Sequence, residues 1–337
     1  RYYREHIRTN VVFLTVAPMD ERGFFNFGPQ VSHAMALCET ADTVILEVNP
    51  NMPRCLGGFE EAIHIDNVSM ITEANWPLPQ LSPISPSETD RRIAELIMEH
   101  LRDGDCLQLG IGGMPNAVGA LIAQSDLKDL GIHTEMFVDS FVDMIESGRV
   151  TGARKNIDKY KVVCTFALGG KKTYDFIDDN PAVAFYPVDY TNDPEIIARN
   201  DRVVAVNNCV ETDIFGQVCS ESFGARQISG TGGQLDFTFG AYRSEGGRAF
   251  ICMSSSHASK NGTRVSRIRP SLTPGAVVTV PRSMVHFLVT ENGIANLKGL
   301  TLWERAEAII SIAHPDFRDE LIKEADALGV WRRSNRR

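Results

Sequence analysis

The chain has 337 residues, of which 43% are hydrophobic and 23% are charged, and its formal net charge is −9. This composition is typical of a folded globular protein and excludes a disordered chain, and the length suggests two domains. The acidic charge argues against a nucleic-acid partner, which would favour a basic surface. No apolar run approaches the roughly 18 residues of a membrane helix, so we expect no membrane partner.

The seven cysteines form no CxxC pair, and most of them lie inside apolar runs such as KVVCTFAL and FICMS. This pattern predicts buried thiols in a reducing compartment, and therefore a cytoplasmic protein. We expect no zinc or other metal site.

The first part of the chain alternates predicted strands and helices with short loops, as in an α/β fold. Residues 10–18 (NVVFLTVAP) are all apolar except for Asn10 and Thr15, and they predict a strand buried on both faces. A short helix is expected at 32–37, a second buried strand at 43–48 and a third strand at 68–71.

The segment 77–86 (PLPQLSPISP) contains four prolines and is the most linker-like part of the chain. We place a domain boundary there, so that one domain covers residues 1–85 and the other covers 86–337. The alternative is a surface loop inside one domain.

The second part predicts a larger α/β domain with a mainly parallel sheet. Ser87 and Asp90 resemble a capping box that opens a helix, which Gly104 ends. A strand at 106–109, a glycine turn and a helix from about Asn116 follow, and a helix is expected at 141–147. Further strands are expected at 162–168, 183–187, 203–207, 248–253, 276–280 and 287–290, with helices at 193–199 and 302–312.

The glycine turn follows a strand and opens a helix, so it could gather free backbone N–H groups around an anion or a carbonyl oxygen. It is neither a GxGxxG motif nor a Walker motif. The alternative is a tight turn that needs glycine only for its backbone conformation.

Glu135 lies in an expected strand, IHTEMF, after the helix that the turn opens. In a regular strand, alternation puts His133, Glu135 and Phe137 on one face. Glu135 could face a ligand held by the turn, or it could be a solvated acid at the end of a strand. We assign no catalytic role to His133.

The segment 209–222 holds three acids, Glu211, Asp213 and Glu221. The first two alternate onto one face of a strand, so a metal site or a general-acid pair is conceivable. The alternative is a strand that ends in a polar loop.

Two more segments have alternative interpretations. The second glycine loop, 229–237 (SGTGGQLDF), is either a flexible turn or a loop that a ligand approaches closely. The basic residues Lys260, Arg264, Arg267 and Arg269 form either a solvated edge strand or a site for a phosphate-bearing ligand.

Several separated motifs together resemble the acetyl-CoA hydrolase/transferase family, above all its butyryl-CoA:acetate and 4-hydroxybutyrate CoA-transferases. These motifs are LQLGIGGMPNAV, HTEMFVD, SGTGGQLDF, VTENGIANLKG and RAEAIISIAHPDFRDEL. The resemblance runs over essentially the whole chain. It implies that residues 1–85 are the last part of an N-terminal domain whose start is missing, consistent with a beginning, Arg1-Tyr2-Tyr3, that lacks Met.

The resemblance also implies site residues. Glu135 matches the family's catalytic glutamate, and the order of glycine loop, helix and acid-bearing strand favours it over Glu211 and Glu291. Asn192 and Gly232 are implied near the acyl group and the oxyanion. The implied CoA contacts are Gly110, Ile111, Gly112, Gly113, Met114, Val210, Gly233 and Lys260, and Gly233 is also implied in the oxyanion hole.

The family's fold implies two α/β domains of the CoA-transferase type, with the active site in the cleft between them. The implied activity is an acyl-CoA:carboxylate CoA-transferase, with acyl-glutamyl anhydride and glutamyl-CoA thioester intermediates. An acyl-CoA hydrolase on the same scaffold is the alternative, and a binding module without turnover is a third possibility.

The implied partners are a short-chain acyl-CoA, butyryl- or 4-hydroxybutyryl-CoA, and a carboxylate such as acetate. No cofactor is implied, because CoA is part of the substrate, and a homodimer is expected. We also expect His33, Asn49 and the GFFNFG loop to shape the acyl pocket.

Overall fold

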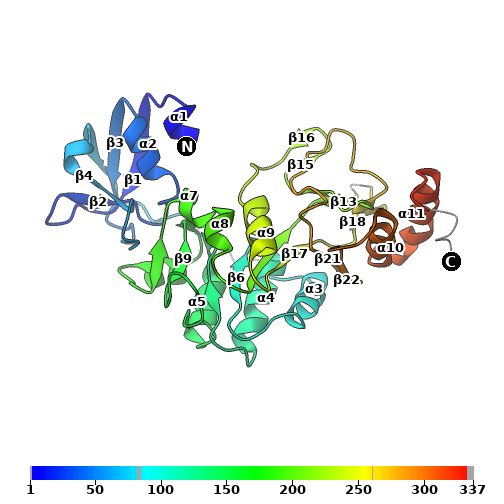
Figure 1. Ribbon diagram of the computed structural model, residues 1–337. Coiled ribbons are helices and arrows are strands. Elements are labelled where there is room, and N and C mark those ends of the chain that lie inside the picture. Colours follow the sequence, from blue (N-terminus) through cyan, green and yellow to red (C-terminus); the bar gives the residue numbers. More distant parts are fainter. Residues whose placement is uncertain (1, 82–84, 260, 332–337) are drawn as a thin grey trace.

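The computed structural model describes residues 2–81, 85–259 and 261–331, and they form a mixed α/β fold (Figure 1). The N-terminal residues make a small lobe, drawn in blue, around a three-stranded parallel sheet of order β1-β3-β5. The elements of this lobe are α1 (Tyr2–Glu5), β1 (Val11–Val16), β2 (Phe24–Asn26), α2 (Ala34–Thr40), β3 (Thr43–Val48), β4 (Ala62–His64), the 3₁₀ turn η1 (Ile65–Asn67) and β5 (Met70–Glu73).

The predicted strand at 10–18 is confirmed as β1, but the prediction that both its faces are buried is wrong. Val12 and Val16 lie in the core, whereas Val11 and Phe13 are 58% and 55% exposed. Side chains alternate across a strand, so only one face of β1 is covered. The third strand is also displaced: it begins at Met70, and its four residues are all exposed.

The main sheet has six strands in the order β22-β21-β17-β12-β6-β7, and every neighbouring pair is parallel except β21 with β22. The predicted, mainly parallel sheet is therefore confirmed. Strand β12 pairs with β6 on one side and β17 on the other, and its first five residues are buried, as expected of a central strand. The strands are β6 (Cys106–Leu109), β7 (Gly131–Ile132), β12 (Val203–Asn208), β17 (Arg248–Cys252), β21 (Phe287–Thr290) and β22 (Gly293–Asn296).

The predicted capping box is confirmed, because the Asp90 N–H donates to Ser87 Oγ at 3.1 Å and the Ser87 N–H donates to Asp90 Oδ2 at 2.9 Å. The helix after the glycine turn begins at Gly113, earlier than expected, since a proline such as Pro115 is tolerated in a first turn. The helices of this part are α3 (Glu88–Met98), α4 (Gly113–Gln124), α5 (Asp139–Glu146), α6 (Lys171–Ile177), α7 (Val188–Thr191), α8 (Pro194–Ile197), α9 (Gln234–Arg243), α10 (Leu302–Ser311) and α11 (Pro315–Ala327).

Three expectations for the second part need correction. The strand expected at 162–168 is broken in two, and the helix expected at 193–199 is only the short α8. The strand expected at 276–280 is wrong: Val280 alone makes an isolated bridge, with Val218, while Val277 and Val278 are exposed. The remaining strands are β8 (Met136–Phe137), β9 (Val162–Cys164), β10 (Phe166–Ala167), β11 (Val183–Phe185), β13 (Glu211–Asp213), β14 (Val218–Cys219), β15 (Ser222–Phe223), β16 (Arg226–Gln227), β18 (Ser256–Ala258), β19 (Arg264–Ser266) and β20 (Ile268–Arg269).

Backbone hydrogen bonds attach the N-terminal lobe to the segment around β10 and β11. The Ser32 N–H donates to the Thr165 carbonyl at 3.0 Å, and the Val188 N–H donates to the Ser32 carbonyl at 2.8 Å. The Phe185 N–H donates to Leu56 in the same way. The predicted boundary near residue 85 stays a prediction, and residues 82–84 lie outside the described residues.

All seven cysteines are buried free thiols, as their apolar surroundings predict. Burial raises the pKa of Cys106 to about 11 and that of Cys209 to about 12, so both stay protonated at neutral pH. None of the helices in the described ranges is both long and apolar enough to cross a membrane.

One ion pair is buried beside the main sheet. Arg248 of β17 lies 2.5 Å from Asp105, whose side chain is fully buried, and it also donates to the His100 carbonyl. We expect Arg248→Met to lower the free energy of unfolding by about 3–5 kcal/mol, because it leaves a buried charge without its partner. Urea unfolding followed by circular dichroism measures this loss.

The matched control is Arg154→Met, which removes an exposed ion pair with Asp129. Exposed pairs contribute at most about 1 kcal/mol. Equal losses in the two variants would contradict the assignment of Arg248 as the more important partner.

Candidate functional site

Glu135 lies in a bend between two short strands, not inside a continuous strand as predicted. Strand β7 pairs with β6 of the main sheet, whereas β8 pairs with β10. The chain thus leaves one sheet and joins another at Thr134 and Glu135, so the alternation expected for 132–137 does not hold. The backbone of Glu135 is fixed here, because its carbonyl accepts the Thr165 N–H at 3.0 Å.

The carboxylate of Glu135 is partly buried and receives two hydrogen bonds. The backbone N–H of Gly233 donates to Oε2 at 3.0 Å, and the side chain of Asn192 also hydrogen-bonds it. Burial raises the pKa of Glu135, and these two hydrogen bonds oppose the rise because they favour the charged form. The structure therefore brings together three of the predicted site residues.

The position of Gly233 leaves no room for a side chain. A Cβ atom there would lie 2.4 Å from Asn192 Nδ2 and 2.4 Å from Glu135 Oε2. Gly233 is also the N-cap of α9, so its N–H belongs to a helix end that attracts negative charge. In the second glycine loop the backbone therefore lies directly against the Glu135 carboxylate, and this contact requires glycine at position 233.

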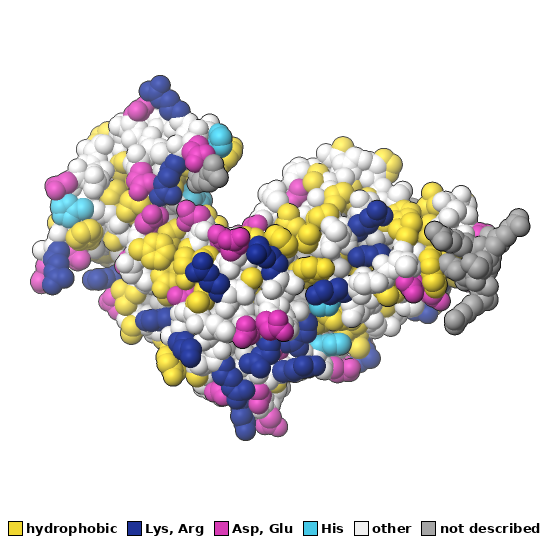
Figure 2. Space-filling model, in the orientation of Figure 1, with side chains coloured by type: hydrophobic (Ala, Val, Ile, Leu, Met, Phe, Trp, Pro, Cys, Tyr) yellow, Lys and Arg dark blue, Asp and Glu magenta, His cyan; other side chains and the backbone are white. Residues whose placement is uncertain are grey.

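A cavity of about 480 Å³ opens in front of Glu135. It is bordered by α7 and by residues at the starts of α8 and α9. The surface of the molecule is hollowed beside the N-terminal lobe (Figure 2). Asn192 is buried, and its Oδ1 atom has no hydrogen-bond partner in the described part of the chain. The lining residues are Glu135, Val188, Asp189, Asn192, Asp193, Gly232 and Asp236.

Asp236 is a site residue that the sequence analysis missed. It stands in the first turn of α9, and burial together with the nearby charges of Glu135 and Asp193 raises its pKa to about 6. The spacing GGQLD could have revealed it, because an acid three residues after the N-cap of a helix lies beside that helix end.

The glycine turn is connected to the second glycine loop by side-chain amides. Asn208 donates to the Ile111 carbonyl at 3.3 Å, and Gln234 donates to the Asn208 carbonyl at 3.2 Å. Gly112 has a φ of +121° and caps α4, and Ile111 is 61% exposed. The turn thus presents a helix N-terminus and an exposed apolar side chain, although its residues do not line the cavity at Glu135.

Val210 lies apart from Glu135, in a cavity of about 270 Å³ that Arg267 and Arg269 also line. Arg264 of the basic segment is occupied elsewhere, because it contacts His314 at 2.8 Å. The predicted residue Lys260 lies outside the described residues.

The acids considered as rivals of Glu135 have structural partners. Glu211 accepts hydrogen bonds from the Thr273 N–H and hydroxyl, both at 2.8 Å, and Asp213 accepts the Gln217 N–H at 2.9 Å. Glu291 accepts the Ser255 N–H. Across residues 2–81, 85–259 and 261–331, no group of three His, Cys, Asp or Glu side chains could hold a metal ion.

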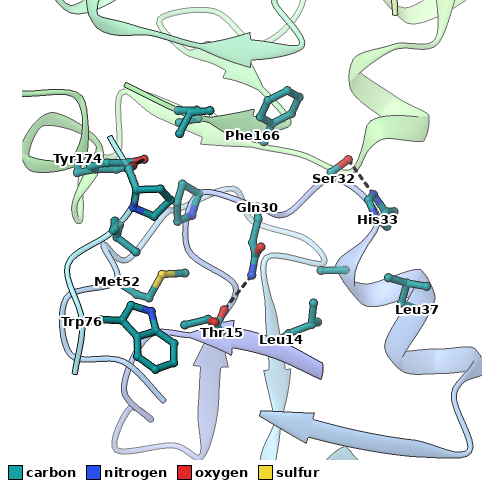
Figure 3. Close-up of a pocket in the computed structure, with 16 residues that line it drawn as sticks. Leu14, Thr15, Gln30, Ser32, His33, Leu37, Met52, Trp76, Phe166 and Tyr174 are labelled. Atoms are coloured by element: carbon teal, nitrogen blue, oxygen red, sulfur yellow. Dashed lines mark hydrogen bonds between the residues drawn. The ribbon is translucent and has the colours of Figure 1, made fainter. Parts of the chain in front are cut away.

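A second cavity, of about 510 Å³, lies between the N-terminal lobe and α6 (Figure 3). His33 lines it beside Ser32, while Asn49 is buried and donates its amide to the Trp76 carbonyl. Glu135 does not line this cavity. The expectation that His33, Asn49 and the GFFNFG loop shape the acyl pocket stays a prediction, because His33 and Glu135 line different cavities.

We expect Gly233→Ala to raise the pKa of Glu135, because the added methyl group displaces the N–H that favours the charged carboxylate. Carboxyl ¹³C NMR titration measures this pKa, with Glu135→Gln to assign the signal. Gly230→Ala is the matched control, since a Cβ there meets no atom within 4 Å. An unchanged Glu135 pKa in Gly233→Ala would contradict this account of the hydrogen bond.

Comparison with known proteins identifies relatives over nearly the whole chain. The butyryl-CoA:acetate CoA-transferase of Anaerostipes caccae is 55% identical, over 99% of this chain and 76% of that protein. The 4-hydroxybutyrate coenzyme A transferase of Clostridium kluyveri is 43% identical, over 96% of this chain and 74% of that protein. The crystal structure of RipA from Yersinia pestis superposes with a TM-score of 0.92 at 42% identity, over 98% of this chain and 73% of that one.

Two family models match the chain as well. Residues 2–80 match the acetyl-CoA hydrolase/transferase N-terminal domain, and residues 169–325 match the acetyl-CoA hydrolase/transferase C-terminal domain. The resemblance drawn from the sequence motifs is confirmed, and the chain belongs to the acetyl-CoA hydrolase/transferase family.

Proposed function

We propose that this protein is an acyl-CoA:carboxylate CoA-transferase that moves CoA between a short-chain acyl-CoA and acetate, with Glu135 as its nucleophile. The observation that carries the proposal is the convergence of the Gly233 N–H and the Asn192 amide on one partly buried carboxylate. The transferase names of relatives at 43% and 55% identity support the reaction class. The two α/β parts of the chain would face each other across the active site.

In this mechanism a carboxylate oxygen of Glu135 attacks the thioester carbonyl of the acyl-CoA. The tetrahedral intermediate expels CoA thiolate and leaves an acyl-glutamyl anhydride. The thiolate then attacks the glutamyl carbonyl, which gives a glutamyl-CoA thioester and releases the first carboxylic acid. A second carboxylate takes the same steps in reverse, so atoms and charges balance without an added cofactor.

The residues around Glu135 suit these steps. A partly desolvated carboxylate with a raised pKa is a better nucleophile than a hydrated one. When the thiolate attacks the glutamyl carbonyl, negative charge develops on an oxygen of Glu135, and the Gly233 N–H and the Asn192 amide, which contact this carboxylate, would donate to it. Losing one donor of this kind typically costs about 10²–10³ in rate.

The pantetheine and nucleotide parts of CoA would be held away from the reacting atoms. We assign its contacts to the turn of Gly110, Ile111, Gly112, Gly113 and Met114, to Val210 and to Lys260. Arg267 beside Val210 suits a phosphate, whereas Arg269 in the same cavity lies 3.6 Å from Glu211. Binding energy from these remote contacts can be used to force the geometry of the anhydride.

The covalent step is tested by mass spectrometry after incubation with butyryl-CoA and reduction with borohydride. We expect the modification at Glu135. The Glu135→Gln variant should show neither the modification nor turnover. Glu291→Gln is the control, because Glu291 is a rival acid whose carboxylate accepts the Ser255 N–H instead. Modification at another glutamate in an active protein would refute the assignment.

The transferase and the hydrolase differ in their need for an acceptor acid. Incubation with butyryl-CoA with and without acetate should give acetyl-CoA only with acetate, and little free CoA without it. Release of CoA at the same rate without acetate would show that water accepts the acyl group and would favour the hydrolase.

The charge of Asp236 should shift the acid limb of the pH profile, which reports the ionisation of Glu135. Glu135 attacks only when ionised, and the charge of Asp236 in the same cavity favours its protonated form, since Coulomb repulsion acts on both carboxylates. Asp236→Asn should therefore move the acid limb of kcat/KM to lower pH. The exposed Asp319→Asn on α11 should leave it in place, and a shift to higher pH would contradict this coupling.

Two further parts of the proposal concern the protein's surroundings. Its seven buried free thiols suit a reducing compartment, so we place it in the cytoplasm. The homodimer rests on the general frequency of twofold assemblies, and analytical ultracentrifugation tests it.

A further inference from the structure

We infer that His133 is a positioning residue, which holds the Asn192 amide and the Gly233 N–H at the right spacing around Glu135 and transfers no proton itself. The inference rests on the proposed function, because it gives those two donors a role in the reaction. It starts from the place of His133 in the chain, two residues before Glu135 and only 1% exposed.

One side of the imidazole holds the segment that carries Asn192. Nε2 lies 2.8 Å from the carbonyl oxygen of Thr191, the residue directly before Asn192. A carbonyl oxygen only accepts, so Nε2 carries the proton. Nδ1 is buried and has no partner among the described residues, which fits a neutral ring with a single proton.

The ring also lies beside aromatic side chains of the elements that carry the two donors. The ring of Tyr190, from α7, lies 6.4 Å away between centroids, and the ring of Phe237, from α9, lies 6.3 Å away. The Phe237 N–H donates to the Gly233 carbonyl at 3.0 Å, so this ring belongs to the first turn behind Gly233. His133 thus packs between the Asn192 side and the Gly233 side of the site.

Hydrogen bonds also hold Tyr190 and the backbone next to His133. The Tyr190 hydroxyl donates to Asp158 Oδ2 at 3.0 Å, and Lys155 donates to the Ile132 carbonyl at 3.1 Å, one residue before His133. Burial and the Lys155 charge lower the pKa of His133 to about 3. The ring is therefore neutral near neutral pH, which leaves it the role of a fixed donor.

Two substitutions separate the donor from the bulk of the ring. The amide nitrogen of glutamine reaches about as far as Nε2, whereas that of asparagine reaches only as far as Nδ1, which has no partner here. We expect His133→Asn to lower kcat about 10²-fold, since a misplacement of about 1 Å can cost that much. KM for butyryl-CoA should stay unchanged, and His133→Gln should restore most of kcat.

Three results would overturn the inference. The first is wild-type kcat in His133→Asn. The second is an equal loss of kcat in His133→Asn and His133→Gln, accompanied by an equal loss of thermal stability. That result would show that His133 has a structural role only. The third is the disappearance of a limb of the pH profile of kcat in His133→Gln, which would show proton transfer.

The adduct experiment separates this inference from the proposed function. If the wild-type protein forms no adduct at Glu135, the proposed nucleophile is wrong. If the wild-type protein forms the adduct and His133→Asn forms it at the same rate, only the positioning role is wrong.

Discussion

The hydrogen bond from the Gly233 N–H to the Glu135 carboxylate is the interaction on which the site depends. Its partners are 98 residues apart in the chain, and they meet only because the chain crosses from the main sheet to β8 while α9 begins against the same bend. A side chain at Gly233 would occupy the place of that bond. The fold thus places the N-terminus of α9 against the Glu135 carboxylate.

Local patterns in the sequence were enough to predict the elements whose causes are local. Strands β3, β6 and β21 have the predicted bounds, and the Ser87 capping box is present, because apolar runs and cap spacings act over a few residues. The interruption at Glu135 and the lack of a strand at 276–280 depend on which distant strands are available for pairing. That information is not present in a short window of sequence.

The site divides in the same way. The sequence predicts both glycine loops as loops. The hydrogen bond from Gly233 to Glu135 depends on tertiary structure and cannot be predicted from either segment alone. Family resemblance, not periodicity, points to Glu135. Asp236 lies only three residues after Gly233 in the sequence, but only the structure shows that it shares a cavity with Glu135. Spacing along the chain identifies the kinds of residue present, whereas packing decides which of them act together.

The attachment of the N-terminal lobe has a mechanical consequence. Ser32 of the lobe donates to the carbonyl of Thr165, and the N–H of Thr165 donates to the carbonyl of Glu135. Two backbone hydrogen bonds and one residue thus join the lobe to Glu135. The place of the lobe and the backbone of Glu135 are therefore linked, and a displacement of the lobe would reach Glu135 through Thr165.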